Sequence, residues 1–276
     1  MKLPAAPLLF FHLMAAVMFA QPAGFSMAAQ ARLDREFASP AISFLLLDSS
    51  GSVLAQRWPE GVETPIPVGS LVKPFLAIAY GEQHGDEFPS VRCQGTKSRC
   101  WYPPGHGRLG LKDALAHSCN TYFLHLSESL DRPLATQTLA RYGLHGPDAK
   151  AANDNLAGLG DGWREAPITL ARAYLKLAGD HDNRDEALVR EGMMAAASYG
   201  TARTLDRSLG ANAILAKTGT AACMHRPRTS ADGFAVAIYP AAQPRLILLV
   251  REDGKTGAST AMTAAAMLRA LGVLAP

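Results

Sequence analysis

The apolar positions of this chain follow two different periods, and the switch between them predicts where strands and helices lie. Two short apolar runs, residues 42–47 and 53–56, flank the polar turn Asp-Ser-Ser-Gly-Ser, which predicts a β-hairpin. Further strand-like runs come late in the chain, at residues 213–216, 233–239 and 245–250. Helical spacing dominates residues 70–209 between them, and a last helix is expected over residues 259–271.

Strands at both ends of the chain enclose a helical middle, and this order predicts an α+β fold. We expect one antiparallel sheet with helices on its faces, in which the first and last strands meet, and an all-helical region beside it. The 276 residues suffice for one large domain or two small ones. No linker-like stretch interrupts the pattern, so a single domain over residues 32–276 is predicted.

The N-terminus has the composition of a targeting segment. Lys2 precedes an apolar stretch over residues 5–20, and small residues follow it, which is typical of a secretory signal peptide. We predict such a peptide over residues 1–31, with cleavage within residues 26–31. The alternative is an uncleaved membrane anchor, but prolines and a histidine interrupt the segment, which is shorter than the roughly 20 apolar residues of a membrane span. In either case the rest of the chain is expected outside the cytoplasm.

Charge and composition exclude some classes of function. The formal net charge is only +3, with both signs mixed along the chain, which is too mild for a nucleic-acid-binding protein. We find no internal repeat, and Gly158-Leu159-Gly160 is not followed by the helix start that a nucleotide site needs. No cofactor and no nucleic-acid partner are predicted.

Three short motifs carry the chemistry of this sequence. In chain order they are Ser70-Leu71-Val72-Lys73, Ser118-Cys119-Asn120 and Lys217-Thr218-Gly219-Thr220. Each motif alone occurs often by chance. Their context is specific, however: the first opens an apolar helical run at residues 71–80, the second lies between helical patterns at residues 111–117 and 121–130, and the third continues a strand.

These motifs contain the side chains that covalent acyl transfer needs when no histidine takes part: two serine hydroxyls, two lysine amines and a carboxamide. A serine hydroxyl is a poor nucleophile at neutral pH, so a base must remove its proton. Lys73 lies one helical turn after Ser70, and burial beside a second cation, Lys217, would lower the pKa of its amine enough for this role. Ser70 also opens a helix, where backbone N–H groups favour developing negative charge. The less specific alternatives are a helix cap for Ser70, turn residues for Ser118 and Asn120, and an exposed strand edge for Lys217.

A second Lys-Thr-Gly string, Lys255-Thr256-Gly257, follows the last predicted strand. We expect it to be a solvated loop. The string that begins at Lys217 is taken as the functional copy, because it extends a strand.

The three motifs in this order resemble those of the transpeptidase domain of penicillin-binding proteins, within the wider serine penicillin-recognising superfamily that includes the β-lactamases. Other stretches that share the resemblance are residues 118–123, 158–162, 167–174 and 199–202. The resemblance extends over roughly residues 41–272 and implies a β-lactamase/transpeptidase-like fold.

The resemblance also implies roles for individual residues. The backbone N–H groups of Ser70 and Thr220 would form the oxyanion hole, and Ser118 would pass a proton to the leaving amine. Asn120 would bind the substrate amide. The terminal carboxylate of the substrate would be held by Lys217, Thr218 and Thr220. Gly219 suits a strand whose backbone pairs closely with the substrate.

These roles imply an exported serine D,D-transpeptidase or D,D-carboxypeptidase at the periplasmic or extracellular face of a bacterial cell envelope. Its substrate would be the D-Ala-D-Ala end of a peptidoglycan stem peptide, and β-lactams would be covalent inhibitors. Membrane association is expected only through the N-terminal segment.

Two alternatives remain open at the level of sequence. One is a β-lactamase, but Glu165 lacks the E-x-x-L-N context of the deacylating glutamate in class A enzymes and is expected to be a surface residue. Asn120 also stands where class D enzymes carry the valine of Ser-x-Val. The other alternative is a non-catalytic sensor that binds penicillin or peptidoglycan.

The four cysteines all lie beyond the predicted signal peptide. Cys93 and Cys100 bracket a short polar loop, and in an oxidising compartment they are predicted to form a disulfide. Cys119 is expected to be a small buried residue, and a bridge between Cys119 and Cys223 stays open. No metal site is predicted, because no second close cysteine or histidine pair is present and His106 stands alone between glycines, as a loop or packing residue does.

Overall fold

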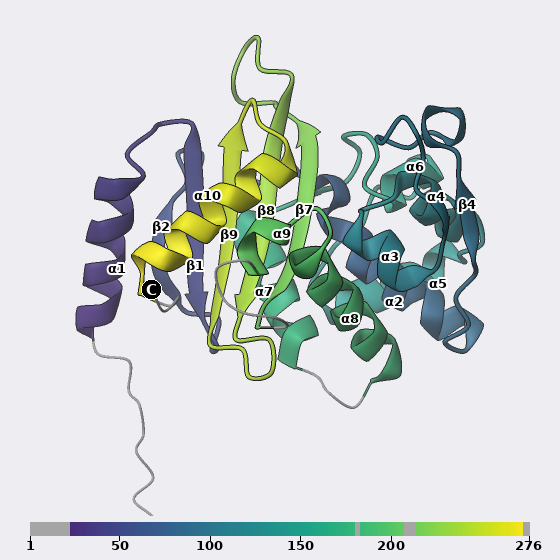
Figure 1. The fold of residues 1–276 in the computed structure, drawn as a ribbon, viewed down its shortest axis with the longest axis horizontal. Helices are drawn as coiled ribbons and strands as arrows, with labels where there is room; N and C mark the ends of the chain where they lie inside the picture. The colour runs from purple at the N-terminus through teal and green to yellow at the C-terminus, as the bar shows by residue number, and fades with distance from the viewer. Residues whose placement is uncertain (1–22, 180–182, 207–212, 273–276) are drawn as a thin grey trace, which may run out of the picture.

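The computed structural model describes residues 23–179, 183–206 and 213–272. At its centre lies a five-stranded antiparallel sheet in the order β2-β1-β9-β8-β7 (Figure 1). The strands are β1 (Ile42–Asp48), β2 (Val53–Arg57), β7 (Leu215–Ala222), β8 (Ala231–Tyr239) and β9 (Leu246–Asp253). Strands β1 and β9 are paired, so the first and last strands meet as the sequence predicted.

A helical region lies beside the β7 edge of this sheet (Figure 1). Its helices are η1 (Gly69–Val72), α2 (Lys73–His84), η2 (Gly95–Ser98), α3 (Leu111–Ala116), α4 (Asn120–Glu128), α5 (Arg132–Arg141), α6 (Asn153–Leu156) and α8 (Arg184–Ser198). Two short antiparallel ladders connect these helices: β3 (Ile66–Pro67) with β6 (Arg164–Glu165), and β4 (Val91–Cys93) with β5 (Gly107–Leu109). The predicted α+β architecture of a sheet with a helical region is confirmed.

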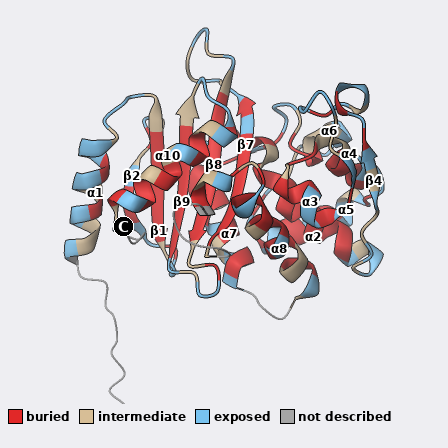
Figure 2. Ribbon diagram, in the orientation of Figure 1, coloured by how far each residue is buried: buried red, intermediate tan, exposed pale blue. Residues whose placement is uncertain are grey.

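Both faces of the sheet are covered, which explains why β1 is a continuous apolar run. Phe44 and Leu46 join the apolar cluster formed with α1 (Ala23–Glu36) and α10 (Gly257–Ala270), whereas Leu45 and Leu47 join the larger cluster on the other face. That second face is covered by α7 (Pro167–Gly179), and α10 crosses the front of the sheet in Figure 1. The short α9 (Arg203–Asp206) packs against α8 and α10. Figure 2 shows the resulting band of buried residues along the central strands.

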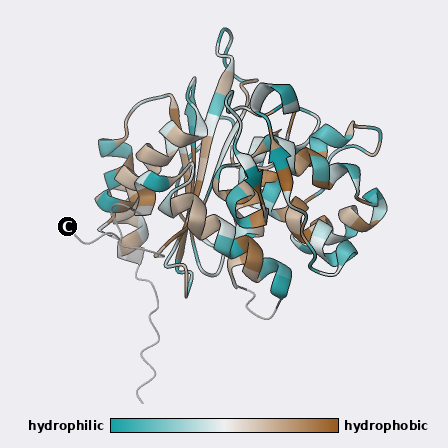
Figure 3. Cartoon of the chain, turned by 45° about the vertical axis from the view of Figure 1, so that its right-hand side comes forward, coloured by the Kyte–Doolittle hydropathy of each residue, from teal (hydrophilic) through white to brown (hydrophobic). Residues whose placement is uncertain are grey.

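Helix α2 runs through the middle of the helical region and carries the first motif. Every residue from Lys73 to Gly81 is buried, so a polar side chain at its first position is enclosed together with the apolar ones. The preceding η1 turn lies against β7, which carries the third motif. Figure 3 shows hydrophobic segments gathered between the sheet and the helices, with hydrophilic segments on the outside. The predicted helix over residues 71–80 therefore corresponds to η1 and α2.

The N-terminal segment is described from Ala23 onward, and residues 1–22 lie outside the described residues. Helix α1 packs against β2, where Ser26 Oγ donates to the Leu54 carbonyl oxygen at 2.6 Å and Leu33 is fully buried. The predicted cleavage segment, residues 26–31, falls within this helix. No helix in the described part of the chain is both long enough and apolar enough to cross a membrane.

Candidate active site

The first and third motifs lie directly against each other. Gly69 has a φ of +53°, and a Cβ at this position would lie 2.7 Å from the carbonyl oxygen of Thr220. A Cβ on Gly219 would lie 3.0 Å from Leu71 Cγ. The positive φ and the short approach require glycine at position 69, and the tight contact at Gly219 leaves little room for a side chain, so both glycines favour the close packing of the η1 turn on β7. This packing places the half-buried Ser70 beside the strand that carries Lys217.

Lys73 is fully buried and bonded to the second motif. Its Nζ donates to Asn120 Oδ1 at 2.6 Å and to the Ser118 carbonyl oxygen at 2.9 Å, and it lies 3.5 Å from Ser118 Oγ. The ring centroid of Phe123 is 5.4 Å away. Burial lowers the pKa of the Lys73 amine to about 7. Within the described residues, its hydrogen bonds go to Ser118 and Asn120 and none goes to Ser70.

Lys217 completes the group from the opposite side. Its Nζ donates to Ser118 Oγ at 2.8 Å and to the Thr218 carbonyl oxygen at 2.6 Å. Burial, and then the charge of Lys73, hold the pKa of Lys217 well below its usual value. The lowered pKa that the sequence predicted for Lys73 is thus found, with burial as its cause, and the Ser118 hydroxyl lies between the two amines.

The third motif lies on an edge strand. In the described sheet β7 has a strand partner only on its β8 side, and the η1 turn packs against it, with residues 215–219 buried and Thr220 exposed. Thr218 Oγ1 donates to Thr201 Oγ1 at 2.6 Å, and the exposed Thr220 accepts a hydrogen bond from the Gly257 N–H at 3.1 Å. Thr201 lies in a stretch that carried the family resemblance, but its contact with Thr218 was not predicted.

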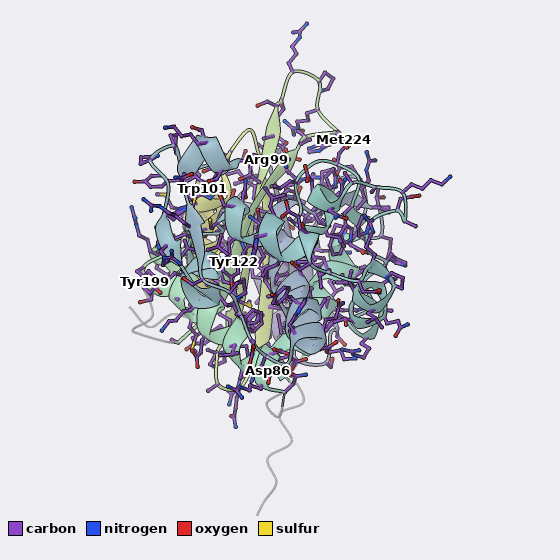
Figure 4. All side chains as sticks on the ribbon, turned by 90° about the vertical axis from the view of Figure 1, so that its right-hand side faces the viewer. Asp86, Arg99, Trp101, Tyr122, Tyr199 and Met224 are labelled. Atoms are coloured by element: carbon purple, nitrogen blue, oxygen red, sulfur yellow. The ribbon has the colours of Figure 1, made fainter. Side chains whose placement is uncertain are left out.

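A cavity of about 650 Å³ opens beside the second and third motifs. Its lining includes Trp101, Tyr102, His106, Tyr199 and Thr201. The indole nitrogen of Trp101 donates to the Ser118 carbonyl oxygen at 3.3 Å, which joins the cavity wall to the second motif. Figure 4 shows Trp101 and Tyr199 on the same side of the molecule. The sequence analysis did not predict that these aromatic residues line one cavity, because they come from segments that meet only in the folded chain.

The second Lys-Thr-Gly string supports the first, which corrects the expectation of a simple solvated loop. Lys255 is exposed as expected. Thr256, however, caps α10 by accepting a hydrogen bond from the Ser259 N–H at 3.3 Å. A Cβ on Gly257 would lie 2.4 Å from the Gly219 carbonyl oxygen. Gly257 therefore packs against the backbone of β7 at Gly219, while Lys255 is exposed to solvent.

Glu165 is buried, so the prediction that it is a surface residue was wrong. Only 1% of its surface is exposed. Its carboxylate accepts hydrogen bonds from the His145 N–H at 2.7 Å, the Gly146 N–H at 3.2 Å and Trp163 Nε1 at 2.9 Å, and His145 Nδ1 lies 2.9 Å from it. A buried carboxylate needs such donors, and here they come from the chain that leads up to the β3–β6 ladder. These contacts assign Glu165 to the framework of the helical region.

The structure does not contain the predicted disulfide between Cys93 and Cys100: all four cysteines have free thiols. Cys119 is buried as expected, with its sulfur 3.8 Å from that of Cys100. Cys223 lies apart from this group and contacts His225. The sequence also missed that His106 faces the sulfurs of Cys93 and Cys100, at 3.5 Å from each.

Comparison with known proteins identifies the class that this fold and site define. The family model for the penicillin binding protein transpeptidase domain matches residues 48–271. The chain therefore belongs to the penicillin-binding protein transpeptidase family, as the resemblance of its motifs predicted. No curated protein matches the chain.

Solved structures share this fold at low sequence identity. Penicillin-binding protein PBP2 of Pseudomonas aeruginosa, solved with WCK 5153, is 20% identical, with coverage of 89% of this chain and 76% of that chain and a TM-score of 0.71. PBP2 of Helicobacter pylori, in complex with MreC, is 16% identical, with coverage of 90% and 63% and a TM-score of 0.74. The transpeptidase domain of the FtsI4 D,D-transpeptidase of Legionella pneumophila is 17% identical, with coverage of 91% and 96% and a TM-score of 0.67. At such identities the likeness shows the fold alone, and it confirms the β-lactamase/transpeptidase-like architecture.

Proposed function

We propose that this protein is an exported serine D,D-acyltransferase that acts on the D-Ala-D-Ala end of peptidoglycan stem peptides. The observation that carries the proposal is the Ser118 hydroxyl held between the buried amines of Lys73 and Lys217. Membership in the transpeptidase family supplies the reaction class, acyl transfer. The substrate lies outside the cytoplasm, which agrees with the signal peptide expected at residues 1–31.

In the proposed reaction, Ser70 Oγ forms a bond to the carbonyl carbon of the penultimate D-Ala. Lys73 takes the hydroxyl proton, and an amine with a pKa of about 7 is neutral often enough at physiological pH to do so. The backbone N–H groups of Ser70 and Thr220 stabilise the oxyanion. The C–N bond then breaks, and the leaving D-Ala nitrogen takes its proton from Ser118, which recovers one from the protonated amine of Lys73, 3.5 Å away. The product is an acyl ester on Ser70.

The other polar groups of the site bind the amide and the terminal carboxylate of the substrate. Asn120 binds the substrate amide, and Lys217, Thr218 and Thr220 hold the terminal carboxylate of the substrate. The peptide backbone pairs with the edge of β7 that has no strand partner in the described sheet, where Gly219 allows a close approach. These assignments extend the roles implied by the family to the positions where the structure has the same residue types.

The fate of the acyl ester separates the possible activities. An incoming amine gives a D,D-transpeptidase, and water gives a D,D-carboxypeptidase. A β-lactamase needs a group that activates water rapidly, and the carboxylate of Glu165, the residue weighed for that role, is saturated by structural hydrogen bonds. This favours slow deacylation, and hence a stable adduct with β-lactams.

The test is intact-mass spectrometry of the purified protein after incubation with a fluorescent penicillin, followed by peptide mapping. We expect one stable adduct on Ser70, no adduct on Ser70→Ala, and full labelling of Ser129→Ala, which changes an exposed serine outside the site. Release of D-Ala from a pentapeptide would support a peptidase over a sensor. Consumption of penicillin without an adduct would indicate a β-lactamase, and an adduct on a residue other than Ser70 would contradict the proposal.

A further inference from the structure

Three cysteines and a histidine converge beside the second motif. Cys93 ends β4, Cys100 and His106 follow in the loop that leads to β5, and Cys119 immediately precedes α4. The three sulfurs and the His106 nitrogen all lie within 4.8 Å of one another. The three cysteine side chains are buried. In the sequence these residues have the spacing C-x6-C-x5-H-x12-C, which none of the close-pair patterns of zinc sites would detect.

The distances between these four atoms fit a tetrahedral metal ion. Zinc bonds of about 2.3 Å to sulfur and about 2.0–2.1 Å to nitrogen give tetrahedral edges of about 3.8 Å between sulfurs and about 3.6 Å between sulfur and nitrogen. The Cys100 and Cys119 sulfurs are 3.8 Å apart, and His106 Nδ1 is 3.5 Å from the sulfurs of both Cys93 and Cys100. A disulfide needs about 2.05 Å between sulfurs, so the spacing matches coordination rather than a covalent bond.

Neighbouring groups hydrogen-bond to the cysteine sulfurs and pack against the His106 ring, as groups around metal ligands do. Thr121 Oγ1 donates to Cys93 Sγ at 3.4 Å, and backbone groups of Gly95 and Asn120 hydrogen-bond to the sulfurs of Cys93 and Cys100. Hydrogen bonds of this kind stabilise thiolates and orient ligands. The His106 imidazole is held by neighbouring rings, with its centroid 5.0 Å from that of Tyr102 and 5.3 Å from that of His117.

The loop itself is shaped to bring the ligands together. A Cβ on Gly95 would lie 1.9 Å from the Pro103 carbonyl oxygen, and a Cβ on Gly105 would lie 2.5 Å from the Cys93 carbonyl oxygen. Both glycines have positive φ, of +67° and +83°. The chain thus folds back on itself twice between Cys93 and His106, as required for three ligands from one loop.

We propose that Cys93, Cys100, His106 and Cys119 bind one zinc ion in a closed, four-ligand structural site. The three thiols give up their protons to solvent as the metal binds, and the imidazole binds as the neutral ring. Four protein ligands leave no position for substrate, so the ion acts on structure and takes no part in the acyl transfer.

A zinc ion bound to Cys119 would hold the backbone of the second motif in place. Cys119 lies between Ser118 and Asn120, whose polar groups contact Lys73, and it makes no side-chain capping bond to α4. Ser118 has a φ of +51°, which is uncommon for a residue with a side chain. A metal bond at Cys119 fixes the turn that holds Ser118 in this conformation. Cys119 is therefore a positioning residue.

Cys223, His225 and Asp232 form another close group in the described residues, and it serves as the control. Its members already have charged partners: His225 Nε2 lies 3.1 Å from Asp253 and 3.8 Å from Glu60. Cys223→Ser therefore removes the remaining cysteine without touching the proposed site.

The test is a Co²⁺ titration of the reduced full chain, followed by displacement with Zn²⁺. We expect a single equivalent to give the visible bands of tetrahedral cobalt and a thiolate charge-transfer band, and Cys223→Ser to keep both. Cys100→Ser and His106→Ala should lose or shift them, and Thr121→Val should weaken cobalt binding 10–100-fold. The proposal would be overturned if the wild-type protein showed no tetrahedral cobalt bands. It would also be overturned if the bands persisted in Cys100→Ser and His106→Ala, or if they were lost in Cys223→Ser.

Three measurements on the unmodified protein keep the test decisive even if a variant fails to fold. X-ray absorption of the zinc form should show three sulfurs at about 2.3 Å and one nitrogen at about 2.0–2.1 Å. A disulfide among Cys93, Cys100 and Cys119 in protein isolated without added oxidant would overturn the site. Chelation should slow penicillin labelling and Zn²⁺ should restore it. If labelling is absent with zinc bound, the proposed acyltransferase function fails while the spectra still establish the metal site.

Discussion

Lys217 Nζ lies 2.8 Å from Ser118 Oγ, although 99 residues separate these residues in the chain. From the other side Lys73 Nζ lies 3.5 Å from the same oxygen. The hydroxyl therefore connects two buried amines whose pKa values are both lowered. A proton that leaves one amine has a short path to the other through Ser118.

Replacement of Ser118 tests this path. We expect Ser118→Ala to slow acylation by fluorescent penicillin about 10²- to 10⁴-fold, because a positioned proton donor typically contributes that much. The matched control is Ser127→Ala, which removes a buried serine that bonds only within α4, to the Leu124 carbonyl oxygen at 2.8 Å. Equal labelling rates in the two variants would show that Ser118 takes no part in proton transfer.

The lowered pKa of Lys73 predicts a specific pH dependence. The amine must be neutral to accept the Ser70 proton, and its pKa is about 7 because it is buried. The second-order rate constant of acylation should therefore rise about tenfold per pH unit below 7 and level off above it. Lys73→Arg, whose guanidinium stays protonated, should lose labelling almost completely. A rate that keeps rising toward the ordinary lysine value of about 10.4 would contradict the role of Lys73 as base.

Local sequence patterns were sufficient to predict the fold class and the family. The apolar run of β1 and the turn after it predicted the hairpin, and Gly69 and Gly219 encode the contact between two motifs that are far apart in the chain. The order of the three motifs then identified the family, because each motif keeps its own local context of helix or strand.

Contacts between distant loops could not be derived in the same way. His106 stands between two glycines, and no sequence spacing indicates that its imidazole meets Cys119 from another segment. Glu165 likewise has a charged side chain that suggests exposure, and only the folded chain supplies the N–H groups of residues 145 and 146 that allow its burial. In both cases the deciding partner lies in a loop whose path is set by tertiary packing.

The second Lys-Thr-Gly string provides a test of the support behind β7. A Cβ on Gly257 would lie 2.4 Å from the Gly219 carbonyl oxygen, so Gly257→Ala must displace the third motif or the start of α10. We expect a loss of about 1–3 kcal/mol in the free energy of unfolding, together with slower penicillin labelling. Lys255→Ala changes the exposed neighbour and should alter neither quantity. A large loss of labelling in Lys255→Ala would mean that the functional lysine had been assigned to the wrong string.

Substitution of Glu165 tests whether its carboxylate stabilises the fold or activates water for hydrolysis of the acyl ester. Glu165→Gln keeps the size of the side chain but replaces one acceptor oxygen with a donor group, which faces N–H groups from residues 145, 146 and Trp163. We expect the free energy of unfolding to fall by about 1–3 kcal/mol, as measured by urea denaturation. The rate at which the penicilloyl ester is hydrolysed should stay unchanged, because this carboxylate has no role in activating water. Glu191→Gln, at an exposed glutamate of α8, is the matched control and should change stability by less than about 0.5 kcal/mol. Slower hydrolysis of the adduct in Glu165→Gln, with stability unchanged, would instead assign the deacylation step to Glu165 and favour a β-lactamase.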